Sequence, residues 1–333
     1  MEDRKNSKRR VVVVTGASAG LGRVVAKEFA NKGADVALIA RGIDGLEGAK
    51  REVEDAGGRA LIFPTDVADA DAVEKAAQEV EEKFGPIDVW VNNAMNGVFS
   101  PVKEMKPEEY KRVTEVTYLG QVYGALSALK RMLPRNRGSI IFVGSALAYR
   151  GIPLQSAYCA SKHAIEGFFD SLRTELLHDK SNVNISMVQL PAMNTTQFQF
   201  VKSRLPFKPK PMGTIYEPEV AAQVIEYASR HARREYYVGW PTVKAIIGNK
   251  IAPWYADWVL SRNGFKDQMT NEPENVNRKN NLWEPLQGDH GGHGPFSKDS
   301  KKFSPITWLS LNKGKVAASV AVFLIGSFIL NRS

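Results

Sequence analysis

The sequence contains almost no cysteine, since Cys159 is the only one among 333 residues. A single thiol excludes an intramolecular disulfide and a metal site built from several cysteines, and it fits a reducing compartment. Walker phosphate loops and internal repeats are also lacking. The first ten residues are basic, but neither a long apolar core nor a small-residue cleavage site follows them. We therefore expect no secretory signal peptide.

Long uncharged apolar runs are scarce as well. The clearest, Val316–Leu330, would give about 22 Å of helix against roughly 30 Å of bilayer hydrocarbon. Extended back to Trp308, the segment reaches about 35 Å, with Lys313 and Lys315 able to snorkel to the interface. We expect residues 306–333 to form a hydrophobic tail that anchors a cytoplasmic catalytic domain to a membrane, because most basic residues precede the run. The alternative is a helix docked on the protein itself or on a second copy.

The composition is close to that of a globular protein, with 43% apolar and 24% charged residues. This argues against a disordered, fibrous or polytopic membrane protein. Lys and Arg number 45 against 36 Asp and Glu, so the net charge is +9. The basic residues are dispersed outside a basic arm of residues 1–8, and we expect no nucleic-acid partner. His290 and His293 lie among glycines that do not preorganise ligands, and we expect no metal site.

Short Val- and Ile-rich runs alternate with longer segments of helical period from residue 9 to about 240. This pattern predicts an α/β fold, a Rossmann-type doubly wound parallel sheet of about seven strands with helices on both faces. The predicted strands are 10–15, 35–40, 60–63, 87–91, 139–144, 184–189 and 235–238. The predicted helices are 21–32, 45–56, 70–84, 107–133, 156–179 and 218–229. Residues 241–305 are predicted to form an extension that is helical at first and then polar.

A glycine-rich turn joins the first predicted strand to the first predicted helix. Glycines permit a tight turn under a phosphate, and the helix N-terminus offers unpaired N–H groups to a pyrophosphate. An ordinary strand-to-helix turn is the alternative, but the strand and helix stand where a dinucleotide site needs them. The cofactor-binding residues predicted here are Thr15, Gly16, Ser18, Gly20, Leu21 and Gly22.

Further candidate cofactor residues follow the next predicted strands, at the edge where open α/β sheets bind ligands. Arg41 ends the second strand, where a fold selective for the unphosphorylated cofactor places Asp or Glu. An arginine would instead attract a 2′-phosphate, which predicts NADP over NAD; a solvated surface arginine is the alternative. Asp66 and Val67 follow the third strand, and Asn93 and Ala94 follow the fourth.

Three side chains with acid–base chemistry come next. Ser145 closes the fifth predicted strand, and Tyr158 and Lys162 lie four residues apart on one helix face. A free phenol has a pKa of about 10, and a neighbouring ammonium should lower that value toward neutrality. Ser145 can donate a hydrogen bond to a carbonyl oxygen that gains negative charge as hydride arrives. This set predicts Tyr158 as the general acid or base.

Taken together, these motifs over residues 9–240 resemble the short-chain dehydrogenase/reductase family. The resemblance implies that Lys162 holds the nicotinamide ribose and that Pro191 to Thr195 flank the carboxamide. It also implies a substrate lid after Thr195 and a homodimer or homotetramer. Met95 stands where the family has glycine. Thr117 stands where the family often has an asparagine that anchors a proton-relay water, and its hydroxyl can still bind one.

The sequence thus predicts an NADP-dependent oxidoreductase that acts on a small-molecule carbonyl or secondary alcohol. A lid that mixes Phe198, Phe200, Phe207 and Tyr216 with lysines and arginines suits a lipophilic substrate, although an ordinary packed lid has the same composition. The alternative function is a nucleotide-binding regulatory or scaffold protein on the same fold, which Met95 and Thr117 motivate. An intact Ser, Tyr and Lys set favours the enzyme, because a binding protein has no need of it.

Overall fold

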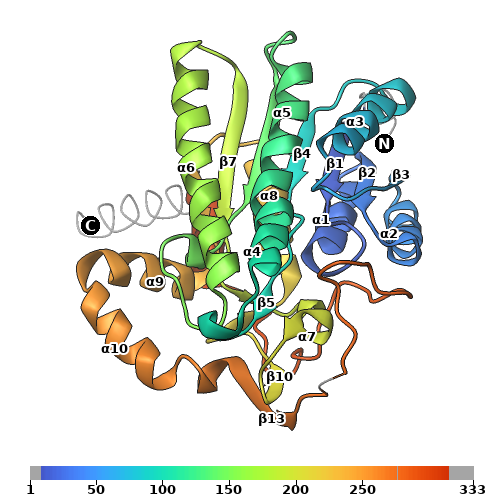
Figure 1. The fold of residues 1–333 in the computed structure, drawn as a ribbon. Coiled ribbons are helices and arrows are strands. Elements are labelled where there is room, and N and C mark those ends of the chain that lie inside the picture. The colour runs from blue at the N-terminus through green and yellow to red at the C-terminus, as the bar shows by residue number, and fades with distance from the viewer. Residues whose placement is uncertain (1–8, 276, 315–333) are drawn as a thin grey trace, which may run out of the picture.

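A seven-stranded parallel sheet forms the centre of the structure, a computed structural model that describes residues 9–275 and 277–314. The strands lie in the order β12-β7-β6-β4-β1-β2-β3, which confirms the predicted doubly wound sheet (Figure 1). Their bounds are β1 (Val11–Thr15), β2 (Asp35–Ala40), β3 (Arg59–Pro64), β4 (Val89–Asn92), β6 (Gly138–Val143), β7 (Val183–Gln189) and β12 (Glu235–Tyr237).

Helices cover both faces of this sheet, because its strands are apolar on both sides. In β1 the side chains of Val12 and Val14 join one core and those of Val11 and Val13 join the other. The helices over the first core are α1 (Gly20–Asn31), α2 (Ile43–Asp55) and α8 (Pro218–Ala228). Those over the second are α3 (Ala70–Phe84), α5 (Gly120–Met132) and α6 (Ser156–His178).

The predicted helix 107–133 is three elements rather than one. It begins as α4 (Pro107–Thr114), widens into a π-helical turn, η2 (Glu115–Leu119), and continues as α5. Thr117 in this turn accepts a hydrogen bond from the backbone N–H of Asn96 at 3.1 Å and donates to its carbonyl at 3.0 Å. These bonds tie the widened turn to the loop after β4. Such π-turns often mark functional sites.

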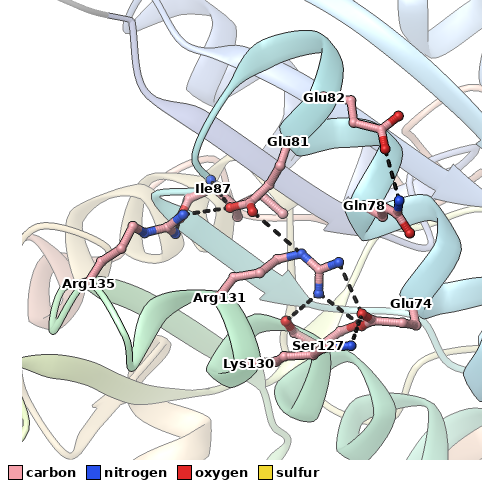
Figure 2. A network of polar contacts seen from close by, with 9 residues as sticks. All are labelled: Glu74, Gln78, Glu81, Glu82, Ile87, Ser127, Lys130, Arg131 and Arg135. Atoms are coloured by element: carbon pink, nitrogen blue, oxygen red, sulfur yellow. Dashed lines mark hydrogen bonds and ion pairs between the residues drawn. The ribbon is translucent and has the colours of Figure 1, made fainter.

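An ion-pair network fastens α3 to α5 (Figure 2). Arg131 of α5 donates to Glu74 of α3 at 2.9 Å, and Arg135 donates to Glu81 at 2.6 Å. Burial would raise the pKa of Glu74, but hydrogen bonds from Arg131 and Lys130 more than offset it and hold that pKa at about 2. The network therefore stays charged near neutrality and fixes the helix that carries η2 at its start.

The chain after β12 wraps around the carboxyl edge of the sheet. Two helices, α9 (Gly239–Ile251) and α10 (Pro253–Asn263), are followed by β13 (Met269–Pro273) and α11 (Pro305–Leu311). Strand β13 pairs with β10 (Phe207–Pro209) in the lid. The other short elements are β5 (Val98–Phe99), β8 (Ala192–Met193), α7 (Gln197–Phe200), β9 (Lys202–Ser203) and β11 (Ile215–Tyr216). The extension that the sequence predicts, helical at first and then polar, thus lies over the carboxyl edge of the sheet.

The two chain ends bear the basic arm and the hydrophobic tail. Residues 1–8 and the run Val316–Leu330, the expected anchor, lie outside the described residues. Within 9–275 and 277–314, no helix has the length and apolar character needed to cross a membrane.

Candidate active site

A cavity of about 870 Å³ opens at the carboxyl ends of the sheet strands. It gathers most of the residues that the sequence singled out, although they are spread over 180 positions. Those on its wall are Gly16, Ser18, Gly20, Leu21, Gly22, Arg41, Asp66, Val67, Asn93, Ala94, Ser145, Tyr158, Lys162, Pro191 and Thr195. The structure therefore brings the predicted nucleotide and acid–base residues into one space.

Two predicted residues lie behind the wall instead. The Thr15 hydroxyl accepts hydrogen bonds from the backbone N–H groups of Asn93 at 2.9 Å and Ala94 at 3.1 Å, so it joins β1 to the end of β4. Thr117 is fully buried, with its hydroxyl held by the Asn96 backbone. The one donor of Thr117 is therefore used within the protein, which leaves a single lone pair of its hydroxyl for a water, and the relay role of Thr117 stays a prediction.

The glycine-rich turn is as tight as a phosphate site requires. Gly16 has φ +68° and Gly20 has φ +57°, values that favour glycine. A Cβ at Gly22 would overlap the carbonyl oxygen of Gly16, so this position also needs glycine. Asn93 braces the turn by donating its side-chain amide to the Thr15 carbonyl at 2.9 Å. The residues fit a nucleotide diphosphate, because the turn lines the cavity at the start of α1.

Ser145, Tyr158 and Lys162 line the same cavity. Ser145 follows β6 and caps a short 3-10 turn, while Tyr158 and Lys162 project from the first two turns of α6. The Lys162 ammonium donates to the Val143 carbonyl at 2.6 Å and lies 5.6 Å from the centre of the Tyr158 ring. The lysine is buried beside the phenol, as the i, i+4 spacing predicts.

The electrostatics of this pair differ from the sequence-based expectation. Burial raises the pKa of the Tyr158 phenol, and the Ser145 hydroxyl offsets only part of the shift. Burial also lowers the pKa of Lys162 to about 7, so this ammonium is only partly charged near neutrality. The predicted lowering of the Tyr158 pKa by Lys162 is therefore wrong for this structure. The phenol is held protonated, the form that can give a proton to a substrate oxygen.

Arg41 and Asp66 also line the cavity, and both have protein partners. The Arg41 guanidinium donates to the backbone carbonyls of Asn281 and of Trp283, the second at 2.6 Å. Asp66 forms an ion pair with Arg112. A guanidinium has five N–H donors, so these two bonds leave three of Arg41 for a phosphate.

The C-terminal extension contributes a wall that the sequence did not predict. Residues 281–294, which we call the strap, run across the glycine-rich turn and line the cavity. The strap carbonyl of Gly291 accepts the backbone N–H of Gly20 at 3.0 Å. Asp289 forms an ion pair with buried Arg23 of α1, and Leu282 is fully buried in a small apolar cluster. Because these partners are more than 120 residues apart, no local pattern could reveal them.

Gln189 is a second residue that sequence reasoning missed. Its side-chain oxygen accepts the backbone N–H of Ser145 at 2.8 Å. Its side-chain nitrogen donates to Glu166 at 3.0 Å and to Glu235 at 2.9 Å. This fully buried amide therefore fixes the chain at Ser145. In the sequence, only its position at the end of the β7 strand could have indicated a role near the site.

The lid begins as the sequence suggests, with Phe198 and Phe200 on the cavity wall. Phe207 is exposed on β10 instead, and Tyr216 packs under Gly239 at the start of α9. The basic lid residues Lys202 and Arg204 turn to Glu109 of α4, each at 2.7 Å. An aromatic inner face is thus confirmed only for α7.

The ion pairs that join Glu109 to the lid should weaken in acid. Burial would raise its pKa, but hydrogen bonds from Arg204, Lys202 and the Lys106 backbone hold it at about 2. A depressed folded-state pKa stabilises the fold above the unfolded value of about 4.3 and loses that contribution as pH falls toward 2. We expect Glu109→Gln to lower the free energy of unfolding at pH 7 by about 1.5–3 kcal/mol.

Urea denaturation over a pH series measures this difference. The gap between parent and variant should close as pH falls from about 4 to 2. Glu108→Gln, at the exposed neighbouring position, is the matched control and should follow the parent. A gap that persists at low pH would mean that the carboxylate charge is not the cause.

A Rossmann-type sheet with Ser145, Tyr158 and Lys162 beside a nucleotide-sized cavity defines an NAD(P)-dependent dehydrogenase or reductase. The family model for short chain dehydrogenases matches residues 10–205. The chain belongs to the short-chain dehydrogenase/reductase family.

Individual relatives agree with this assignment. The oxidoreductase YxnA of Bacillus subtilis is 30% identical over 86% of this chain and 81% of its own length. A fatty acyl-CoA reductase of Acinetobacter baylyi is 33% identical over 68% of this chain and 74% of its own. A metagenomic short-chain oxidoreductase solved with NADP is 29% identical, with a TM-score of 0.59 over 70% of this chain and 98% of its own. An alcohol dehydrogenase of Thermococcus sibiricus, solved with 5-hydroxy-NADP, is 26% identical, with a TM-score of 0.58 over 69% and 95%.

Proposed function

We propose that this protein reduces a lipophilic aldehyde or ketone with NADPH. The observation that carries the proposal is that Ser145, Tyr158 and the glycine-rich turn line one cavity. We assign catalysis to residues 9–240 and the closing of the cofactor site to residues 241–305. Phe198, Val259 and Leu260 on the cavity wall favour an apolar substrate. One of the relatives is, by its name, a fatty acyl-CoA reductase.

The residues divide the chemistry as follows. When bound, the nicotinamide nucleotide supplies the hydride that adds to the carbonyl carbon and is itself oxidised. Ser145 donates a hydrogen bond to the carbonyl oxygen, where negative charge develops. Tyr158 transfers its phenolic proton to that oxygen, which completes the alcohol. Lys162 lies beside the phenol, where a ribose hydroxyl can bind its ammonium. Burial keeps the Tyr158 phenol protonated near neutrality, which is the form that donates a proton when a carbonyl is reduced.

The experiment that tests this function follows NADPH oxidation with a panel of aldehydes and ketones of increasing chain length. We expect turnover that improves with chain length. NADPH binding without turnover of any carbonyl would overturn the enzyme proposal and favour the nucleotide-binding scaffold.

The choice of NADP over NAD rests on Arg41. A charge-assisted contact with the 2′-phosphate contributes roughly 1.5–3 kcal/mol, or about tenfold or more in affinity. We expect Arg41→Asp to erase or reverse the preference. Isothermal titration of both cofactors into both proteins measures it. Lys27→Asp, an exposed α1 position, changes the net charge equally and should leave the ratio unchanged. An unchanged ratio in Arg41→Asp would make this arginine a bystander.

We also propose that the hydrophobic tail anchors the protein and that the catalytic residues remain on the cytoplasmic side. The support is the uncharged run Val316–Leu330, with Lys313 and Lys315 before it. Replacing Leu324 and Phe328 with aspartate interrupts this run, and loss of membrane association in that variant is the expected result. The family resemblance also implies a homodimer or homotetramer. Sedimentation of the parent and the variant measures this oligomeric state.

A further inference from the structure

Helix α10 is only loosely packed among the residues that the structure describes: it contacts α9, and its Asp257 forms an ion pair with Arg150. None of its side chains is buried there, although its sequence is rich in aromatic and aliphatic residues. Trp254 is 71% exposed and Trp258 is 50% exposed. Ile251, at the end of α9, is 77% exposed. Figure 1 shows α9 and α10 outside the layers of sheet and helices. A helix of this composition ordinarily buries its apolar stripe against something.

The exposed side chains have the composition of a membrane interface. Tryptophan and tyrosine concentrate where bilayers meet water, and lysine and arginine favour anionic headgroups. Residues 239–268 carry four basic and two acidic side chains. All four basic ones are exposed: Lys244, Lys250, Arg262 and Lys266. Trp254, Trp258 and Arg262 are spaced four apart, so they lie along one side of α10, and the Arg262 guanidinium lies 4.6 Å from the Trp258 ring centre.

The opposite side of α10 belongs to the cavity. Tyr255, Ala256, Val259 and Leu260 line the cavity wall, together with Ile251. Ile251 and Tyr255 thus line the cavity and are also exposed. The pair of helices α9 and α10, which we call the α9–α10 hairpin, therefore forms part of the cavity rim. A surface that docked here would face the mouth of the substrate site.

The neighbouring chain adds to the same region. Helix α11 contacts α9, and Thr307 of α11 accepts the backbone N–H of Gly239 at 2.9 Å. Trp308 and Leu309 on α11 are 45% and 46% exposed. Past the described residues the sequence continues into the uncharged run Val316–Leu330. In the sequence, this run therefore follows closely on a helix that contacts α9.

We propose that the α9–α10 hairpin docks on an anionic lipid bilayer and sets the mouth of the cavity against it. Trp254 and Trp258 enter the headgroup boundary, and the four basic residues bind anionic headgroups. The inference gives the proposed lipophilic substrate a route from the bilayer into the site. Docking itself requires no turnover, so its test is independent of the proposed reaction.

The test uses the full chain and vesicles of phosphatidylcholine and phosphatidylglycerol whose acyl chains carry bromine. Bromine quenches only tryptophans that reach the bilayer, and the chain has six. We expect quenching in the parent and loss of more than half of it in Trp254→Phe/Trp258→Phe. Trp283→Phe, an exposed tryptophan of the strap, is the matched control and should keep the parent's quenching. An unchanged NADPH affinity shows that each variant is folded.

Other outcomes overturn the proposal. Equal quenching in the double variant, with loss in Trp308→Phe, would place the lipid contact at α11 and the tail alone. Equal binding to vesicles of phosphatidylcholine only would remove the role of the basic residues. A dimer that Trp254→Ser/Trp258→Ser turns into a monomer, with no quenching in the parent, would make this surface a subunit interface.

Discussion

Tyr158→Phe should lower kcat for carbonyl reduction by about 10²- to 10⁴-fold, because it removes the only hydroxyl proton that Tyr158 can give to the substrate oxygen. The ring remains, so the packing beside Lys162 and the affinity for NADPH should change little. Stopped-flow measurement of NADPH oxidation separates the chemical step from product release.

Tyr123→Phe on α5 removes the same hydroxyl from a tyrosine away from the cavity wall and should keep the parent's rate. If Tyr158→Phe also kept that rate, another group would be the proton donor. A loss of NADPH affinity equal to the loss of rate would instead point to a damaged site.

Asp289→Ala should speed the entry and exit of the cofactor about tenfold to a hundredfold. The strap lines the cavity and runs across the glycine-rich turn. Asp289 holds it to Arg23 through two hydrogen bonds, while its carboxylate also accepts the Gly291 N–H at 3.1 Å. Charge-assisted bonds contribute roughly 1.5–3 kcal/mol to the closed strap, which corresponds to that range of rates. Stopped-flow fluorescence of NADPH measures both steps.

The two rates should rise together, so that the equilibrium affinity changes less than either of them. Asp299→Ala removes an exposed carboxylate just beyond the strap and is the matched control. Unchanged rates in Asp289→Ala would show that the strap does not limit access to the cavity.

Local patterns determined the sheet and the turn. In β1 four consecutive valines must be covered on both faces, which predicts a central parallel strand. The turn at Gly16 and Gly22 and the pair Tyr158 and Lys162 are short-range features, because backbone geometry and helical period act over a few residues. The alternation of strands and helices up to residue 240 placed them at one edge.

Only the tertiary structure decided the rest, because it depends on contacts between distant residues. The sequence suggests Thr117 as a water ligand, and only the fold shows that the loop carrying Asn96 uses its hydroxyl donor. The sequence predicts that Lys162 lowers the pKa of Tyr158. In the structure, burial raises that pKa instead, and it also leaves the Lys162 ammonium only partly charged near neutrality. The strap lies on α1 because Arg23 and Asp289 meet across 266 positions. Desolvation and long-range pairing depend on the whole folded chain, so no window of sequence contains them.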